Sequence, residues 1–144
     1  MGEVLMELSR ILITELGDQQ VIFLREKDGP RNFPILIGLN EAMAIDRRLK
    51  NKPTLRPMTH DLLANVISHL DARVERIVVT ALKRKTFYAK IILRRDGHVI
   101  EVDSRPSDAI AIAVRVAAPI FVEEELFELL GKPEVKEDSG TEQE

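Results

Sequence analysis

The sequence predicts an α+β domain in which helices pack on two three-stranded antiparallel β meanders. Two turn pairs, Asp28-Gly29 and Asp96-Gly97, each lie between short apolar runs that are typical of strands joined by tight turns. Each group of three runs leads into a segment whose apolar residues recur at helical spacing. A chain of 144 residues with 44% hydrophobic residues can bury one core, which favours a single domain.

The first half of the chain supplies the first meander and two helices. Its strands are expected at residues 4–15, 21–25 and 33–37. Pro34 cannot donate a ladder hydrogen bond, so the third strand is expected at a sheet edge or to begin there. We expect Asn40 to cap a helix over 41–49 and Thr59 to cap a second helix. The second helix is expected to bury one apolar face, formed by Leu63, Val66, Ile67 and Leu70.

The second half repeats this plan. Strands are expected at residues 74–82, 87–93 and 99–102, followed by a short strand over 119–122 and a helix over 123–130. Residues 132–144 carry five acidic residues against two lysines and show no apolar pattern, which is typical of disorder. We therefore divide the chain into a domain over 1–131 and an acidic disordered tail over 132–144.

The segment over residues 102–115 is expected to form a buried helix at the centre of the domain. Pro106 suits a first helical turn, and Asp103 or Ser104 can cap the free N–H groups there. The apolar residues that follow also fit the alternation of a strand, but the alanines among them favour a helix. A helix that is apolar on all sides is normally buried.

The two halves resemble each other. Glu41-Ala42-Met43-Ala44-Ile45 follows the first turn pair, and Asp108-Ala109-Ile110-Ala111-Ile112 follows the second at nearly the same spacing. An internal duplication is one interpretation. The alternative is that two meanders feeding buried helices select similar small residues.

Composition narrows the classes of function. The tail accounts for the whole net charge of −3, so residues 1–131 are neutral and lack the overall basic character of a strong nucleic-acid binder. Any such binding must come from a local patch, for which Arg47-Arg48-Lys50-Lys52 and Lys83-Arg84-Lys85 are candidates, although solvated surfaces also explain them. No apolar run approaches the roughly 18 residues that span a bilayer, and cysteine is absent. We expect a cytoplasmic protein without membrane contact.

Two similar motifs carry the candidate chemistry. Arg56-Pro57-Met58-Thr59-His60-Asp61 and Arg105-Pro106-Ser107-Asp108 each combine a guanidinium, a hydroxyl and a carboxylate at a helix start. Carboxylates are hard ligands for Mg²⁺ or Mn²⁺, and histidine is suited to proton transfer. The candidate residues fall into three groups. The catalytic candidates are His60, Asp61, Asp103 and Asp108. The substrate-binding candidates are Arg56, Thr59, Arg105, Ser107 and Arg115. The candidate metal ligands are Glu41, Asp61, Asp103 and Asp108. The alternative is that the same residues are caps and salt bridges.

At these residues the sequence resembles the bifunctional nuclease domain family. The resemblance covers about residues 4–130 and rests on five blocks in order: 33–42, 56–62, 86–89, 102–111 and 118–122. It implies a nuclease acting on RNA and DNA, and the two Arg-Pro motifs match the family pattern. The rival interpretation is a non-enzymatic binding or regulatory module. Open meanders leave strand edges that proteins tend to cover or pair, so we also expect a homo-oligomer, most simply a dimer.

Overall fold

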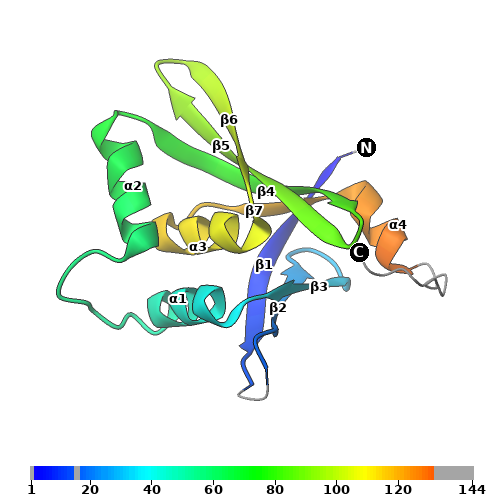
Figure 1. Ribbon diagram of the computed structural model, residues 1–144. Helices are drawn as coiled ribbons and strands as arrows, with labels where there is room; N and C mark the ends of the chain where they lie inside the picture. The colour runs from blue at the N-terminus through cyan, green and yellow to red at the C-terminus, as the bar shows by residue number, and fades with distance from the viewer. Residues whose placement is uncertain (1, 15–16, 132–144) are drawn as a thin grey trace.

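The computed structural model describes residues 2–14 and 17–131, which form one mixed sheet and the helices packed on it (Figure 1). The strands are β1 (Glu3–Leu12), β2 (Gln20–Glu26), β3 (Asn32–Ile37), β4 (Arg73–Lys83), β5 (Thr86–Arg95), β6 (His98–Ser104) and β7 (Ile120–Glu123). The helices are α1 (Leu39–Leu49), α2 (Thr59–His69), α3 (Pro106–Val116) and α4 (Glu124–Gly131). The predicted α+β class is confirmed. The predicted tail over 132–144 lies outside the described residues.

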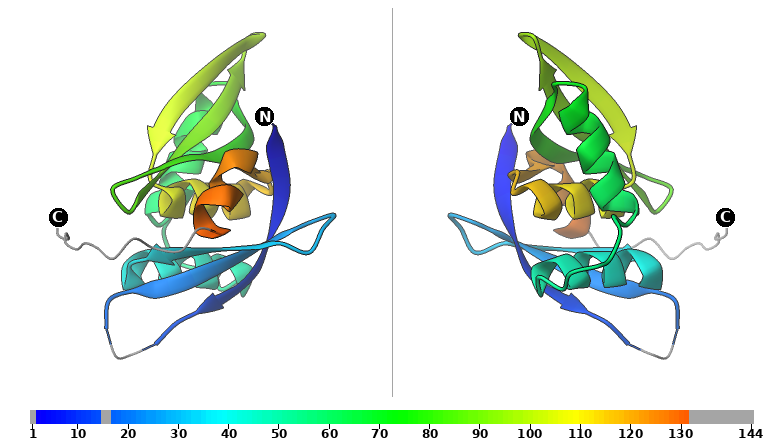
Figure 2. Two further views of the ribbon diagram at one scale, coloured as in Figure 1. Left: turned by 90° about the vertical axis from the view of Figure 1, so that its right-hand side faces the viewer. Right: turned by 90° about the vertical axis from the view of Figure 1, so that its left-hand side faces the viewer.

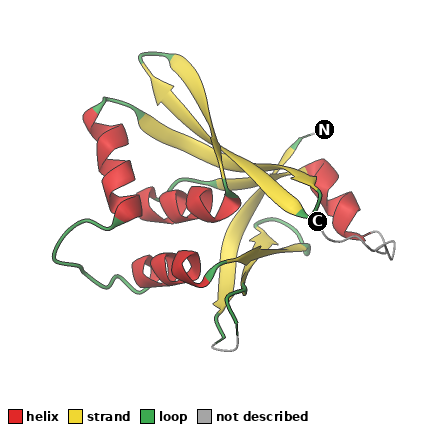
Figure 3. Ribbon diagram, in the orientation of Figure 1, coloured by secondary structure: helices red, strands yellow, loops and turns green. Residues whose placement is uncertain are grey.

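Both predicted meanders form, and β7 joins them into one sheet. The strand order is β3-β2-β1-β7-β4-β5-β6. β7 pairs antiparallel with β1 and parallel with β4, whereas the pairs within each meander are antiparallel. Figures 2 and 3 show the two meanders turned against each other, with helices lying between them. The local sequence predicted a short strand at β7 but not its two partners.

The core lies where the two meanders and the helices meet. On β3, Phe33, Ile35 and Ile37 are buried while the alternate residues are exposed, as expected for a strand with one covered face. The Phe33 ring meets Phe87 of β5 and Phe127 of α4 edge-on, with centroid distances of 5.3 and 5.4 Å. These contacts tie one end of the sheet to the other meander.

α3 is the buried helix that the sequence predicts. It lies beside α1 and α2 and packs on β4 and β5, and most of its residues are buried. Ile110 and Ile112 are fully buried, and each contributes roughly 1.5–3 kcal/mol by leaving water. Pro106 occupies the first turn as expected, but the residue preceding the helix is Arg105. The predicted caps Asp103 and Ser104 were wrong, because both belong to β6.

The other two predicted caps also differ from the structure. α1 follows Gly38 and α2 follows Met58, so Asn40 and Thr59 lie inside their helices. The apolar face predicted for α2 is largely exposed, and Ala64 is the buried position. α2 packs against α3 and also contacts β4. The internal duplication stays a prediction, because a shared order of elements does not establish it.

The second meander contains two tight hairpin turns that have the same backbone form but differ in conformational cost. Asp96-Gly97 joins β5 to β6 with φ of 52° and 78°, and Arg84-Lys85 joins β4 to β5 with φ of 54° and 66°. Positive φ at both central residues suits Asn-Gly or Asp-Gly. Arg84 and Lys85 have side chains that make this conformation unfavourable.

Replacing Arg84-Lys85 by Asn-Gly should therefore stabilise the domain. We expect the free energy of unfolding to rise by about 1 kcal/mol, because the strain relieved exceeds the added chain entropy of glycine. Urea denaturation followed by circular dichroism measures the change. The reverse exchange, Asp96-Gly97 to Arg-Lys, should destabilise by a similar amount. Equal free energies of unfolding for all three proteins would show that the backbone of Arg84-Lys85 is not strained.

Candidate functional site

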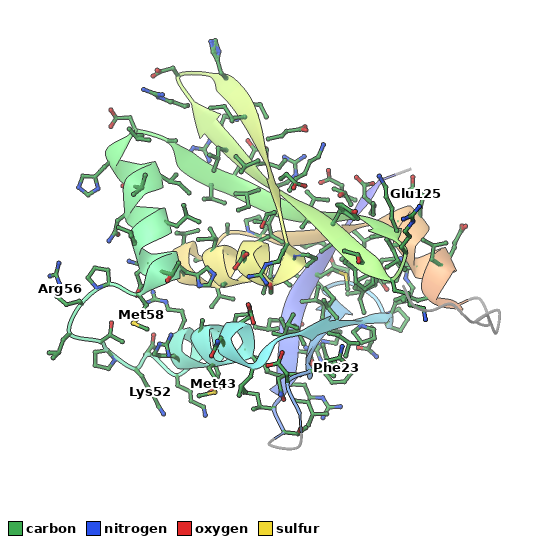
Figure 4. The ribbon with its side chains drawn as sticks, viewed as in Figure 1. Phe23, Met43, Lys52, Arg56, Met58 and Glu125 are labelled. Carbon is green, nitrogen blue, oxygen red and sulfur yellow. The ribbon has the colours of Figure 1, made fainter. Side chains whose placement is uncertain are left out.

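The candidate site lies where the loop over 50–58 and the start of α2 cross α1 and α3. Two cavities meet there. The basic cavity has a volume of about 310 Å³ and is lined by five cationic side chains: Arg47, Arg48, Lys52, Arg56 and Arg115. The second, which we call the dyad cavity, has a volume of about 390 Å³. His60 and Arg47 line both cavities. Figure 4 shows Lys52 and Arg56 on the connecting loop, with Arg56 projecting away from the helices.

His60 forms a dyad with Asp108. The distance from His60 Nε2 to Asp108 Oδ1 is 2.9 Å. Arg105 donates from Nε to Asp108 Oδ2 at 3.0 Å, and its Nη2 lies 3.1 Å from Oε2 of Glu41. The His60 and Asp108 side chains are 18% and 32% exposed, so solvent reaches both. The dyad is thus held in an open site by a guanidinium that bridges α1 and α3.

Asp108 is ionised at neutral pH. Burial opposes its ionisation, but hydrogen bonds from Arg105 and His60 outweigh burial and hold the pKa of this carboxyl below its ordinary value. A neutral His60 therefore donates its Nε2–H to the carboxylate. Nδ1 is then the ring atom that can accept a proton.

Asp61 belongs to a neighbouring ion pair. Arg115 donates from Nε to Asp61 Oδ1 at 2.9 Å, and the backbone N–H of Met58 donates to Oδ2 at 3.0 Å. The Met58 hydrogen bond, aided by Arg115, lowers the pKa of Asp61 in spite of partial burial. Asp61 lines the basic cavity and not the dyad cavity. Its carboxylate therefore holds Arg115 in place.

The remaining candidates lie in different places. Arg56 lines the basic cavity, and Thr59 lines the dyad cavity. Ser107 is buried and lines a third cavity on the other side of Arg105. Asp103 stands on exposed β6 opposite Lys90 and lines neither cavity of the site. The structure thus brings together all the candidates except Asp103 and Ser107.

The acidic residues predicted as metal ligands do not form a ligand cluster. Asp61 is paired with Arg115, and Asp108 and Glu41 share Arg105. Among residues 2–14 and 17–131, no group of three or more His, Asp or Glu side chains is placed to hold a metal ion. A guanidinium at each carboxylate competes directly with a cation. This donor set does not fit the predicted metal.

Three further cations of the site lie in a cluster that the sequence offered as a candidate phosphate-binding patch but did not connect with the Arg-Pro motifs. Arg47, Arg48 and Lys52 come from the end of α1 and the loop after it, within a cluster that a solvated surface could also explain. Lys50 of the same cluster pairs with Asp46 instead. The sequence does contain a feature that could have connected them with the site: the basic cluster is followed directly by the loop that ends at Arg56-Pro57.

The fold and the site define an α+β domain with a basic cleft around a histidine–aspartate dyad. The chain belongs to the bifunctional nuclease domain family, whose model matches residues 22–134. It is 40% identical over 131 residues to an uncharacterized protein of Mycobacterium tuberculosis, covering 91% of this chain and 77% of that protein. No described helix has the length and hydrophobicity needed to cross a membrane.

Two plant proteins are more distant relatives. Bifunctional nuclease 2 of Oryza sativa subsp. japonica is 29% identical over 118 residues, which cover 79% of this chain and 36% of that protein. Bifunctional nuclease 1 of Arabidopsis thaliana is 28% identical over 114 residues, which cover 76% of this chain and 35% of that protein. This chain thus spans about a third of each plant protein.

Acid should weaken the domain through Asp61 and Asp108. Both pKa values are lowered in the folded state, so their contribution is complete above the unfolded value of about 3.9 and is lost as the pH falls through the lower folded values. Asp61→Asn should cost about 1 kcal/mol at pH 7 and should flatten the loss of stability between pH 5 and pH 2, roughly the range in which such groups titrate. Denaturant unfolding across that range measures both effects.

Asp103→Asn is the matched control, because Asp103 is exposed on β6. Its unfolding free energy should stay within about 0.5 kcal/mol of the parent at every pH. An identical acid response in Asp61→Asn and the parent would show that the pair with Arg115 does not stabilise the fold.

Proposed function

We propose that this domain is a nuclease that hydrolyses phosphodiester bonds in RNA and DNA. The observation that carries the proposal is the position of His60, held by Asp108 at 2.9 Å at the junction of two cavities, one of them lined by five cations. Membership of the family and the names of the plant relatives support the same class of substrate. The domain itself is near neutral, so this local patch supplies the attraction for a polyanion.

The cations of the basic cavity would bind the phosphates. Arg47, Lys52 and Arg56 form no ion pair with any acidic residue in the described part of the chain. A guanidinium binds a phosphate through two parallel hydrogen bonds, and it also stabilises the charge that develops on the phosphate during hydrolysis. Arg47 lines both cavities and is placed to contact the phosphate nearest His60.

His60 would act as the general base. Its Nδ1 takes a proton from a water molecule whose oxygen attacks phosphorus. The bond from phosphorus to the leaving sugar oxygen breaks, and that oxygen takes a proton from solvent. Asp108 orients the imidazole and stabilises its protonated form. Water is the nucleophile in this scheme because DNA lacks a 2′-hydroxyl group.

The predicted Mg²⁺ or Mn²⁺ has no step in this scheme. The carboxylates that would bind it are paired with arginines, so metal dependence is a separate prediction that the assay tests. The cytoplasmic location expected from the composition also stays a prediction.

Hydrolysis of fluorescently labelled RNA and DNA tests the proposal. His60→Ala should lower the rate at least roughly 100-fold, as expected for loss of a general base, while the protein stays folded because Arg105 still pairs with Asp108. His69→Ala is the matched control, because His69 is exposed at the end of α2 and contacts a backbone carbonyl of its own helix. Its rate should equal that of the parent. Each protein is assayed with added Mg²⁺ and with a chelator.

Equal rates for the parent and His60→Ala would show that His60 is not the general base and that the activity comes from another source, such as a contaminating nuclease. The rival function is a phosphate-binding or nucleic-acid-binding module in which the same ion pairs only hold the fold. That function is supported if the pure parent protein binds oligonucleotides and cleaves none of them. If the parent protein loses its activity only when the chelator is present, a metal ion takes part in the mechanism.

We also propose that the domain is a homo-oligomer. β6 is an edge strand whose Val99, Ile100 and Val102 are exposed, and α2 exposes apolar residues near the same end of the molecule. Exposed edges and apolar faces of this kind tend to be paired. Light scattering should give a mass above the 16.3 kDa of one chain at micromolar concentration. The double substitution Val99→Lys and Val102→Lys should shift the measured mass toward that of one chain.

A further inference from the structure

A large cavity lies outside the dyad and takes no part in the proposed chemistry. Its volume is about 740 Å³, and it lies between the edge strand β3, the β4–β5 turn and the start of α3. Figures 1 and 2 show that turn close to β3, and Figure 4 marks Phe23 on the β2 side. We call it the apolar cavity. Its lining includes Phe23, Leu36, Phe87 and two cations, Lys85 and Arg105.

The apolar cavity continues the candidate site. It shares Arg105 with the dyad cavity, and the dyad cavity shares His60 and Arg47 with the basic cavity. Arg105 is 63% exposed, and its contacts with Asp108 and Glu41 use Nε and Nη2. Nη1 makes no hydrogen bond to a described residue. It can bind a phosphate without releasing Asp108.

The cation at the far end of this cavity, Lys85, is held in an unfavourable backbone conformation. Lys85 lines the cavity from a turn in which both central residues have positive φ, although neither is glycine or asparagine. Residues held in unfavourable backbone conformations occur preferentially at functional sites. Lys85 and the nearby aromatic Phe87 therefore line one surface.

We propose that the apolar cavity is a base-binding subsite for single-stranded nucleic acid, placed a fixed number of nucleotides from the bond that is cleaved. This inference rests on the proposed nuclease function. A flexible strand would run from the basic cavity over His60 and past Arg105, and one unpaired base would enter the apolar cavity. There the base packs against the apolar lining, which includes Phe87, while Arg105 and Lys85 bind the flanking phosphates. A base that is stacked and paired inside a duplex cannot enter.

Oligonucleotide binding tests the subsite without relying on cleavage. All measurements use His60→Ala, so that the strand stays intact, and fluorescence anisotropy gives the dissociation constant. The ligands are a labelled 12-nucleotide single strand, its duplex, and single strands with an abasic linker at each position in turn. One abasic position should weaken binding roughly five- to 100-fold, as expected for the loss of one stacked base. The duplex should bind more weakly than the single strand.

Variants of the cavity identify where that base binds. Leu36→Glu puts a negative charge into the lining at a position that is 59% exposed, so the fold should tolerate it. It should abolish the abasic effect, whereas Leu12→Glu, at 46% exposure outside the cavity, should preserve it. Lys85→Ala should weaken binding of every single strand, and Lys27→Ala, in the exposed β2–β3 turn, should not.

Three results would overturn the subsite. Equal binding of all abasic strands would show that no base is bound. An abasic effect that survives Leu36→Glu would place the base elsewhere. Equal affinity for the duplex and the single strand would remove the single-strand preference. Each of these leaves the nuclease function intact, provided that Arg47→Ala weakens binding. Failure of any oligonucleotide to bind would overturn the nuclease function and the subsite together.

Discussion

The burial of α3 is the constraint on which the rest of the structure depends. Its two charged residues, Asp108 and Arg115, lie about two helical turns apart, at the edges of the buried surface of the helix. Consecutive residues at the start of α2 pair with them, His60 with Asp108 and Asp61 with Arg115. Because neither charge is buried without a partner, α3 can occupy the core. The same two contacts fix α2 across α3.

The candidate site is a consequence of this arrangement. Fixing the first turn of α2 also fixes the loop before it, which carries Lys52 and Arg56 over the end of α1. The described acids near the dyad are used in ion pairs, so Arg47 of α1 and Lys52 and Arg56 of the loop are left to attract an anion. A near-neutral domain thus acquires a strongly basic cleft. The ion pairs that hold the fold and the groups proposed for chemistry are the same residues.

The two tight turns of the second meander differ in what they do. Asp96-Gly97 satisfies the backbone at little cost, and it lies away from the three cavities of the cleft. Arg84-Lys85 adopts the same backbone with residues that do not favour it, and Lys85 reaches the apolar cavity. Charged residues in an unfavourable turn conformation lower the stability of the fold. Such residues are expected where selection acts on binding and not on folding.

The sequence by itself determined the elements, because each depends on neighbouring residues. Apolar periodicity gave both meanders and the buried α3, and Pro106 marked the first turn of that helix. The two Arg-Pro motifs lie at the starts of α2 and α3, which the fold brings together through His60 and Asp108. Tertiary structure decided which residues meet: the partners of β7, the pairing of His60 with Asp108, and the separation of Asp103 on β6. The paired residues among these are 43 or more apart in the chain, as Ile77 and Ile120 are. Asp103, by contrast, lies away from the site although it is close to Arg105 in the sequence. No local sequence pattern predicts these contacts, because they depend on how the helices pack on a sheet whose two meanders are joined by β7.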